Sequence, residues 1–124
     1  IIDIDNFKKI NDTYGHNIGD HAIKLVAKIL KENILSSTLI SRIGGEEFCL
    51  LFFNREKDEI QRLLEDIRKK FENNLVEIDN LKFKYTISIG CTFEYGKNID
   101  EMMQFADKGL YDAKNSGRNK VRYR

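Results

Sequence analysis

The run Gly44-Gly45-Glu46-Glu47-Phe48 constrains the fold of this chain more than any other stretch. It lies between two apolar segments, residues 38–43 and 48–53. Paired glycines suit a backbone bend that other residues resist, and the flanking β-branched and aromatic residues favour strands, so the run predicts a hairpin turn. Two carboxylates on one short turn repel each other unless a cation or a proton relieves them. A metal ion is therefore the first expectation for this hairpin.

The composition of the 124 residues is that of one globular domain, with 41% apolar and 33% charged residues. The formal net charge of +1 gives no general attraction to nucleic acid or to an anionic membrane. No run reaches the roughly 18 apolar residues of a membrane helix. Cys49 and Cys91 lie in apolar sequence without zinc-site spacing and are expected to be buried thiols. We expect a cytoplasmic domain with no nucleic-acid partner and no direct membrane insertion.

Hydrophobic periodicity predicts alternating strands and helices in one domain, residues 1–124, with no internal repeat or linker. Local antiparallel pairing combined with helical crossovers points to the α/β (α+β) class, with one sheet and helices packed against it. The expected elements are a strand ending at Asp3, a helix over 7–11, a turn over 14–17, a helix over 20–35, the hairpin, a helix over 60–71, a turn at 79–80, a strand over 83–90, a helix over 99–113 that stops near Ser116-Gly117, and an edge strand over 119–123.

Asp3 supplies a third acid if its strand neighbours the hairpin that carries Glu46 and Glu47. Carboxylates in small number are what Mg²⁺ binds, usually together with waters and substrate phosphates. The sequence therefore predicts a magnesium site for a phosphate-bearing substrate. In the alternative interpretation, Asp3 only ends a strand and the acid pair is a solvated turn.

Four ordered motifs span nearly the whole chain. They are Asp3-Ile4-Asp5-Asn6-Phe7-Lys8-Lys9-Ile10-Asn11-Asp12 continuing to Gly19-Asp20, Arg42-Ile43-Gly44-Gly45-Glu46-Glu47-Phe48, Thr86-Ile87-Ser88-Ile89-Gly90, and 106–114 continuing to Gly117-Arg118-Asn119-Lys120-Val121. In this order they resemble the GGDEF family of diguanylate cyclases, here with the variant GGEEF. The ordered set is far more specific than the hairpin motif alone.

The resemblance implies a fold like the palm of nucleotide polymerases and of class III nucleotide cyclases, with a central, partly antiparallel sheet flanked by helices. It also implies condensation of two GTP molecules to cyclic di-GMP with release of pyrophosphate, supported by two Mg²⁺ ions per site, which Mn²⁺ can replace. Each domain would offer one half-site, so catalysis would need a homodimer. An upstream sensory or receiver domain would regulate it, in a cytoplasmic protein or in the cytoplasmic part of a membrane-anchored sensor.

The resemblance assigns roles to twelve positions. The implied metal ligands are Asp3, the carbonyl of Ile4, Glu46 and Glu47; the implied catalytic residues are Glu46, Lys8 and Asp3; and the implied substrate contacts are Asn11, His16, Asp20, Gly44, Gly45, Lys114 and Arg118.

Hydrogen-bonding chemistry agrees with the guanine contacts, because the carboxylate of Asp20 can accept from the two N–H groups of guanine while the amide of Asn11 serves the remaining polar atoms. In the alternative interpretation, Asn11 and Asp20 cap helices. Similarly, Lys114 and Arg118 would complement the C-terminus of a helix, Lys8 would be a solvated helix residue, and His16 would be a structural turn residue.

Two departures from the family pattern stand out. The window that would carry an inhibitory Arg-x-x-Asp product site reads Leu35-Ser36-Ser37-Thr38, so product feedback through this site is not expected. The helix and Asp-x-Leu-Thr motif that precede the first strand in the family are absent, and we expect an N-terminally truncated domain. A non-catalytic, GTP-sensing or nucleotide-sensing regulatory domain is the alternative function.

Overall fold

A five-stranded sheet forms the centre of the computed structural model, which describes residues 1–34 and 36–124. The strand order is β2-β3-β1-β6-β7. β1 is antiparallel to β3 and β6, β2 is antiparallel to β3, and the edge strand β7 is parallel to β6. The strands are β1 (Ile2–Ile4), β2 (Thr38–Arg42), β3 (Glu47–Phe52), β6 (Ile87–Cys91) and β7 (Val121–Tyr123). The predicted fold class, a partly antiparallel sheet with helices, is confirmed.

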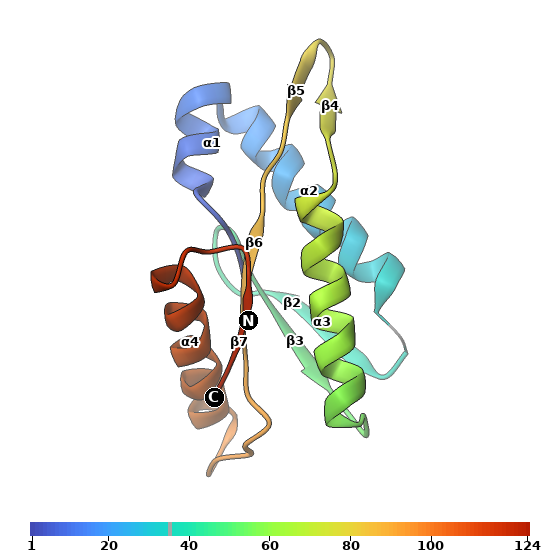
Figure 1. The fold of residues 1–124 in the computed structure, drawn as a ribbon, viewed down its shortest axis with the longest axis vertical. Helices are drawn as coiled ribbons and strands as arrows, with labels where there is room; N and C mark the ends of the chain where they lie inside the picture. The colour runs from blue at the N-terminus through green and yellow to red at the C-terminus, as the bar shows by residue number, and fades with distance from the viewer. Residues whose placement is uncertain (35) are drawn as a thin grey trace.

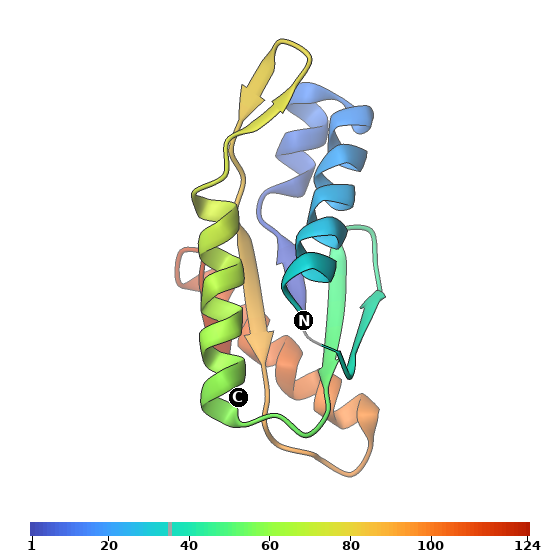
Figure 2. The same ribbon diagram turned by 90° about the vertical axis from the view of Figure 1, so that its right-hand side faces the viewer.

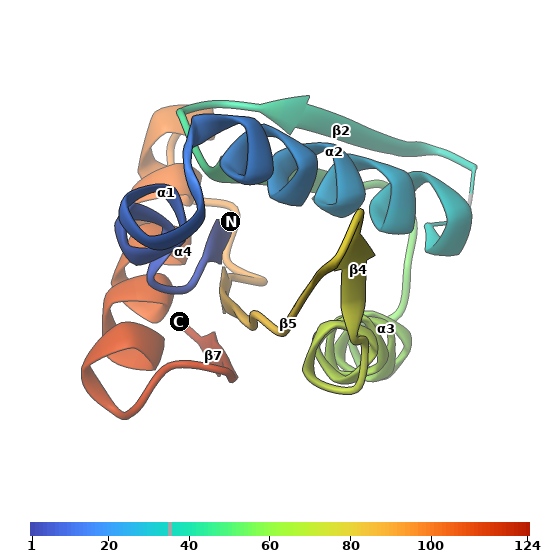
Figure 3. The ribbon, with the colours of Figure 1, turned by 90° about the horizontal axis from the view of Figure 1, so that it is seen from above.

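The described residues form the helices α1 (Phe7–Tyr14), α2 (His16–Asn33), α3 (Lys57–Glu72) and α4 (Ile99–Asn115). α2, α3 and α4 cover the sheet, and α1 packs against α2. Figure 1 shows α4 on one side of β6 and β7 and α3 on the other, and Figure 3 shows α2 beside β2. The main core joins Ile2 and Ile4 of β1 to Val26 of α2 and Ile67 of α3. Ile1 packs instead with Ala106 and Leu110 of α4. Because side chains alternate along a strand, these two clusters mark opposite faces of the sheet.

The predicted strand over residues 83–90 begins too early, because β6 starts at Ile87 and residues 84–86 lie outside any strand. β4 (Val76–Ile78) and β5 (Leu81–Phe83) form a separate hairpin that projects beyond the sheet next to α1 (Figures 1 and 2). Between β5 and β6, Tyr85 is buried and its hydroxyl donates to the carbonyl of Ala22 at 2.9 Å. This tertiary contact separates the two strands, although the alternating pattern continues through them.

The predicted turn over residues 14–17 is also too long. Gly15 alone, with φ of 93°, separates α1 from α2, so α2 begins at His16. The hairpin of β2 and β3, the helices α3 and α4 and the edge strand β7 are confirmed.

Cys49 and Cys91 are half-buried rather than buried, and desolvation raises the pKa of Cys91 to about 11. The window in which a product site was predicted to be missing includes Leu35, which lies outside the described residues.

Candidate functional site

The first element of the site is a pair of facing carboxylates on neighbouring strands. The β1–β3 register places Asp3 opposite Glu47. Burial raises the pKa of Glu47, and the adjoining carboxyl of Asp3 raises it further through a hydrogen bond and through like charge. Two acids that the sequence places far apart are thus brought together in one site.

Lys114 is the positive partner of this acid pair. Its Nζ lies 2.7 Å from Oδ2 of Asp3, whose side chain is 4% exposed. α4 can come this close because Gly90 of β6 has no side chain: a Cβ there would lie 2.1 Å from the backbone of Ala106 and of Leu110. Asp3 is thus buried and paired in addition to ending a strand, and Lys114, which the resemblance assigned to phosphate, contacts a carboxylate in this structure.

The turn between β2 and β3 is held by Arg42, a contact that sequence reasoning missed. The guanidinium of Arg42 donates to the carbonyl of Gly44 at 3.2 Å and to that of Gly45 at 2.8 Å. Neither glycine has a left-handed φ, so the expectation that the bend requires glycine is wrong. A Cβ on Gly45 would meet nothing within 4 Å, and one on Gly44 would meet only Glu47 at ordinary distances. The two glycines therefore leave open space above the turn.

Glu46 lies on the same turn, and its carbonyl accepts from the N–H of Ile4 at 3.3 Å. The backbone of Glu46 is thus fixed beside β1. Within residues 1–34 and 36–124, no group of three or more acidic, histidine or cysteine side chains is close enough to hold a metal ion. The structure therefore brings Asp3 and Glu47 together, and Glu46 does not join them in a three-acid cluster among the described residues.

The donor chemistry of this site fits Mg²⁺. The facing pair of Asp3 and Glu47 offers hard oxygen ligands whose mutual repulsion a divalent cation would relieve. Mg²⁺ typically takes one or two carboxylates and completes its shell with waters and substrate phosphates. Two facing carboxylates are therefore as many protein ligands as a Mg²⁺ site usually has.

The predicted base-binding residues lie around the corner between α1 and α2. Asn11 is on α1, and His16 and Asp20 are one helical turn apart on α2, both exposed. The alternative that Asn11 and Asp20 cap helices is wrong, since both lie inside helices whose flanking cap residues are Asn6, Gly15 and Ile34. Oδ1 of Asn11 is buried and has no hydrogen-bond partner. The side chains of Asn11 and Asp20 are thus not used for capping.

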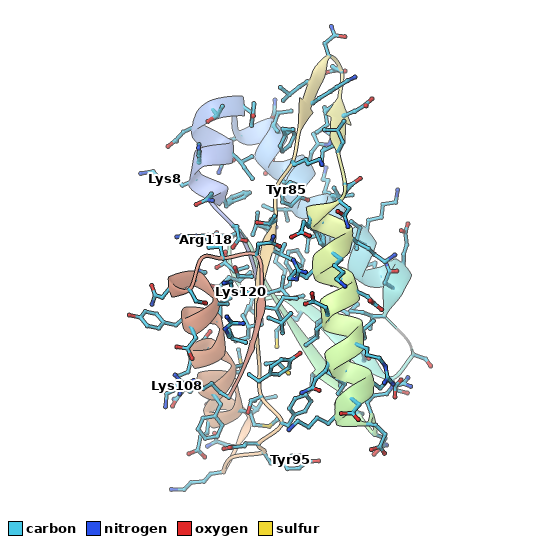
Figure 4. The ribbon with its side chains drawn as sticks, in the orientation of Figure 1. Lys8, Tyr85, Tyr95, Lys108, Arg118 and Lys120 are labelled. Atoms are coloured by element: carbon cyan, nitrogen blue, oxygen red, sulfur yellow. The ribbon has the colours of Figure 1, made fainter. Side chains whose placement is uncertain are left out.

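The predicted catalytic residue Lys8 and the predicted substrate contact Arg118 are exposed cations. Figure 4 shows Lys8 on α1 and Arg118 on the turn between α4 and β7, on the α4 side of the sheet. Gly117, Arg118 and Asn119 all have positive φ, of 113°, 62° and 49°. Two successive non-glycine residues in this region are unfavourable on their own, so the surrounding contacts must hold the turn.

Asp5 supplies those contacts and was assigned no role from the sequence. Its carboxylate is buried and accepts from the hydroxyls of Thr86 at 2.7 Å and Ser88 at 2.6 Å, and from the N–H of Asn119 at 3.0 Å. Arg68 of α3 also donates to Oδ1 of Asn119 at 2.9 Å. The signal in the sequence was an acid that alternates with Ile2 and Ile4 in an apolar strand, where burial requires hydrogen-bond partners.

The comparison with protein families matches residues 1–120 to the model described as "Diguanylate cyclase, GGDEF domain". The chain belongs to the GGDEF family. Among curated relatives, it is 43% identical over 127 residues to the probable diguanylate cyclase DgcT of Escherichia coli K12, covering 98% of this chain and 28% of that protein. The GGDEF chain thus spans less than a third of that relative's length.

Solved GGDEF domains have the same fold. One is the GGDEF domain of DgcB from Caulobacter crescentus in complex with c-di-GMP, with a TM-score of 0.92, 32% identity, and coverage of 98% of this chain and 74% of that chain. Another is the active GGEEF domain of a diguanylate cyclase from Vibrio cholerae, with a TM-score of 0.89, 32% identity and coverage of 98% and 78%. Among the described residues, no helix combines the length and apolarity needed to cross a membrane.

Proposed function

We propose that this GGDEF domain condenses two GTP molecules into cyclic di-GMP and releases two pyrophosphates. The observation that carries the proposal is the facing pair of Asp3 and Glu47 beside Lys114. Three similarities support it: to a protein named a probable diguanylate cyclase, to a GGDEF domain in complex with c-di-GMP, and to a diguanylate cyclase domain called active with the same GGEEF motif.

In the proposed site, Asp3, the carbonyl of Ile4, Glu46 and Glu47 would hold two Mg²⁺ ions. These ions would supply charge neutralisation of the phosphates and a lower pKa of the attacking 3′-hydroxyl. Glu46 accepts the proton of that hydroxyl. The 3′-oxygen forms a bond to the α-phosphorus, and the bond from that phosphorus to the departing pyrophosphate breaks. The same exchange occurs once on each GTP and closes the ring.

Cationic side chains orient the triphosphate in this proposal. Lys8 and Arg118 are exposed and free to reach phosphate oxygens, and Lys114 balances Asp3 in the metal-free chain. The open space above Gly44 and Gly45 admits the phosphates close to the backbone.

Base recognition is assigned to Asn11 and Asp20, with His16 as a further contact. One chain then offers one GTP half-site, so the reaction needs an antiparallel homodimer in which each GTP attacks the other. In a longer protein, an upstream sensory or receiver domain would control this encounter. A purely nucleotide-sensing role remains the competing function.

Glu46→Gln tests the proposal, because glutamine keeps the shape of the side chain and cannot accept the proton. We expect cyclic di-GMP synthesis to fall by a factor on the order of 100 or more, with an unchanged circular dichroism spectrum. Glu94→Gln, in the exposed loop after β6, is the matched control and should keep full activity. Substantial synthesis by Glu46→Gln at the same Mg²⁺ concentration would contradict the proposal.

A further inference from the structure

Gly19 is a glycine that its own backbone does not require. It is the fourth residue of α2 and is buried, and its φ is not in the left-handed region. Inside a helix, glycine is less stable than alanine because it loses more conformational freedom on folding. We therefore expect that neighbouring atoms leave no room for a side chain at this position.

The side chain of Asn11 occupies that space. A Cβ built on Gly19 would lie 1.8 Å from Oδ1 of Asn11, 3.0 Å from its Cγ and 3.3 Å from the ring of Phe7. The first distance is far below any van der Waals contact. The amide of Asn11 can hold this position only while residue 19 has no side chain.

This packing fixes which side of the amide can meet a ligand. Oδ1 of Asn11 is buried against Gly19 and has no hydrogen-bond partner, which is a cost that folding alone does not explain. Nδ2 lies on the opposite side of Cγ, so the donor group is directed away from Gly19. Guanine carries acceptor atoms for such a donor, next to the N–H groups proposed for Asp20.

We propose that Gly19 is a positioning residue for nucleotide recognition, which sets the orientation of the Asn11 amide. The inference rests on the proposed GTP site and adds to it a residue that touches no substrate. Gly19→Ala should turn the amide away from its present position, because the terminal oxygen is the atom nearest to the new methyl group. GTP affinity should fall about fivefold to tenfold, the usual effect of one lost hydrogen bond.

The test is a double-mutant cycle of Gly19→Ala and Asn11→Ala, with Lys24→Ala, exposed on α2, as the control. Titration calorimetry with 3′-deoxy-GTP and Mg²⁺ measures binding without turnover, since this nucleotide lacks the attacking hydroxyl. We expect Gly19→Ala to weaken binding in the native background and to change nothing further when Asn11 is already alanine. Thermal midpoints should be unchanged or higher, which separates positioning from damage to the fold.

A nucleotide-free measurement separates the packing claim from the GTP site. The side-chain amide signal of Asn11 in a ¹⁵N–¹H spectrum, identified by its absence in Asn11→Ala, should shift in Gly19→Ala and not in Lys24→Ala. Native affinity in Gly19→Ala, or an equal loss in both backgrounds, would overturn the positioning role. Failure of the unsubstituted protein to bind 3′-deoxy-GTP would contradict the proposed function itself, and with it any role of Gly19 in nucleotide recognition, even if the amide signal shifts.

Discussion

Asp3 and Glu47 face each other across β1 and β3. Lys114 pairs with Asp3, so the repulsion between the two carboxylates disfavours mainly the ionised form of Glu47. Its pKa is raised by burial first and by Asp3 next, and Lys114 only partly opposes these effects. At the scale of the residue, the metal-free site is thus under electrostatic strain that either a proton or a cation can relieve.

This strain predicts a pH dependence of stability. The folded chain holds the proton of Glu47 more tightly than the unfolded chain does, so the free energy of unfolding should fall as pH rises from the usual carboxyl pKa through the raised pKa. Glu47→Gln should flatten this fall and be the more stable protein near neutral pH. The measurement is the thermal midpoint of both proteins in chelator, from about pH 4 to about pH 8.

A second set of melts, with Mg²⁺ in place of chelator, provides a control. Mg²⁺ added near neutral pH should raise the midpoint of the native protein and have less effect on Glu47→Gln, since one ligand is gone. Identical pH profiles for the two proteins would contradict the account of Glu47.

Single residues were only partly predictable from the sequence. The end of the first strand at Asp3 and the hairpin that carries Glu46 and Glu47 could be predicted, because strand ends and turns follow from local patterns. That Asp3 meets Glu47 and not both acids depends on the pairing of β1 with β3. The pairing of Lys114 with Asp3 depends on how closely α4 approaches Gly90. The hydrogen bond from Arg42 to the carbonyl of Gly45 depends on the side-chain conformation of the arginine. Neither is encoded by spacing along the chain.

At the scale of elements, Asp5 connects the end of β1, the start of β6 and the turn before β7. Asn119 of that turn also accepts from Arg68 and donates to Glu72, so α3 contributes to holding it. Arg118 is therefore presented from a turn that is fixed on two sides.

Asp5→Ala should destabilise the fold and weaken nucleotide binding together. The hydroxyls of Thr86 and Ser88 and the N–H of Asn119 would lose their acceptor, which we expect to lower the free energy of unfolding by about 2–4 kcal/mol. Urea unfolding measures the change, and Asp12→Ala, exposed on α1, should alter it by less than about 0.5 kcal/mol. Equal stability of the two variants would show that the Asp5 contacts are not structurally important.

The helices α3 and α4 and the hairpin of β2 and β3 were predictable because each has a clear period or turn signal. Of the hairpin of β4 and β5, only the turn at residues 79–80 was predicted, since its two strands have three residues each, too few for a period to emerge. The break before β6 depends on the buried Tyr85 and its bond to Ala22. Long-range burial of this kind overrides the local pattern.

At the scale of the whole molecule, the proposed site is assembled from segments that are distant in sequence. β1 and the hairpin carry the acids, α1 and α2 carry the base contacts, and the end of α4 with its following turn carries cations. One chain contributes one such set, and a reaction that joins two GTP molecules needs two. The rate per chain should therefore depend on how often two chains meet.

The most direct test is incubation of the protein with GTP and Mg²⁺ at several protein concentrations, with the nucleotides resolved by chromatography. We expect cyclic di-GMP, with two pyrophosphates released for each molecule formed, and a turnover per chain that increases with protein concentration. GTP that is bound but remains unconverted at every concentration would contradict this expectation and would favour a nucleotide-sensing domain.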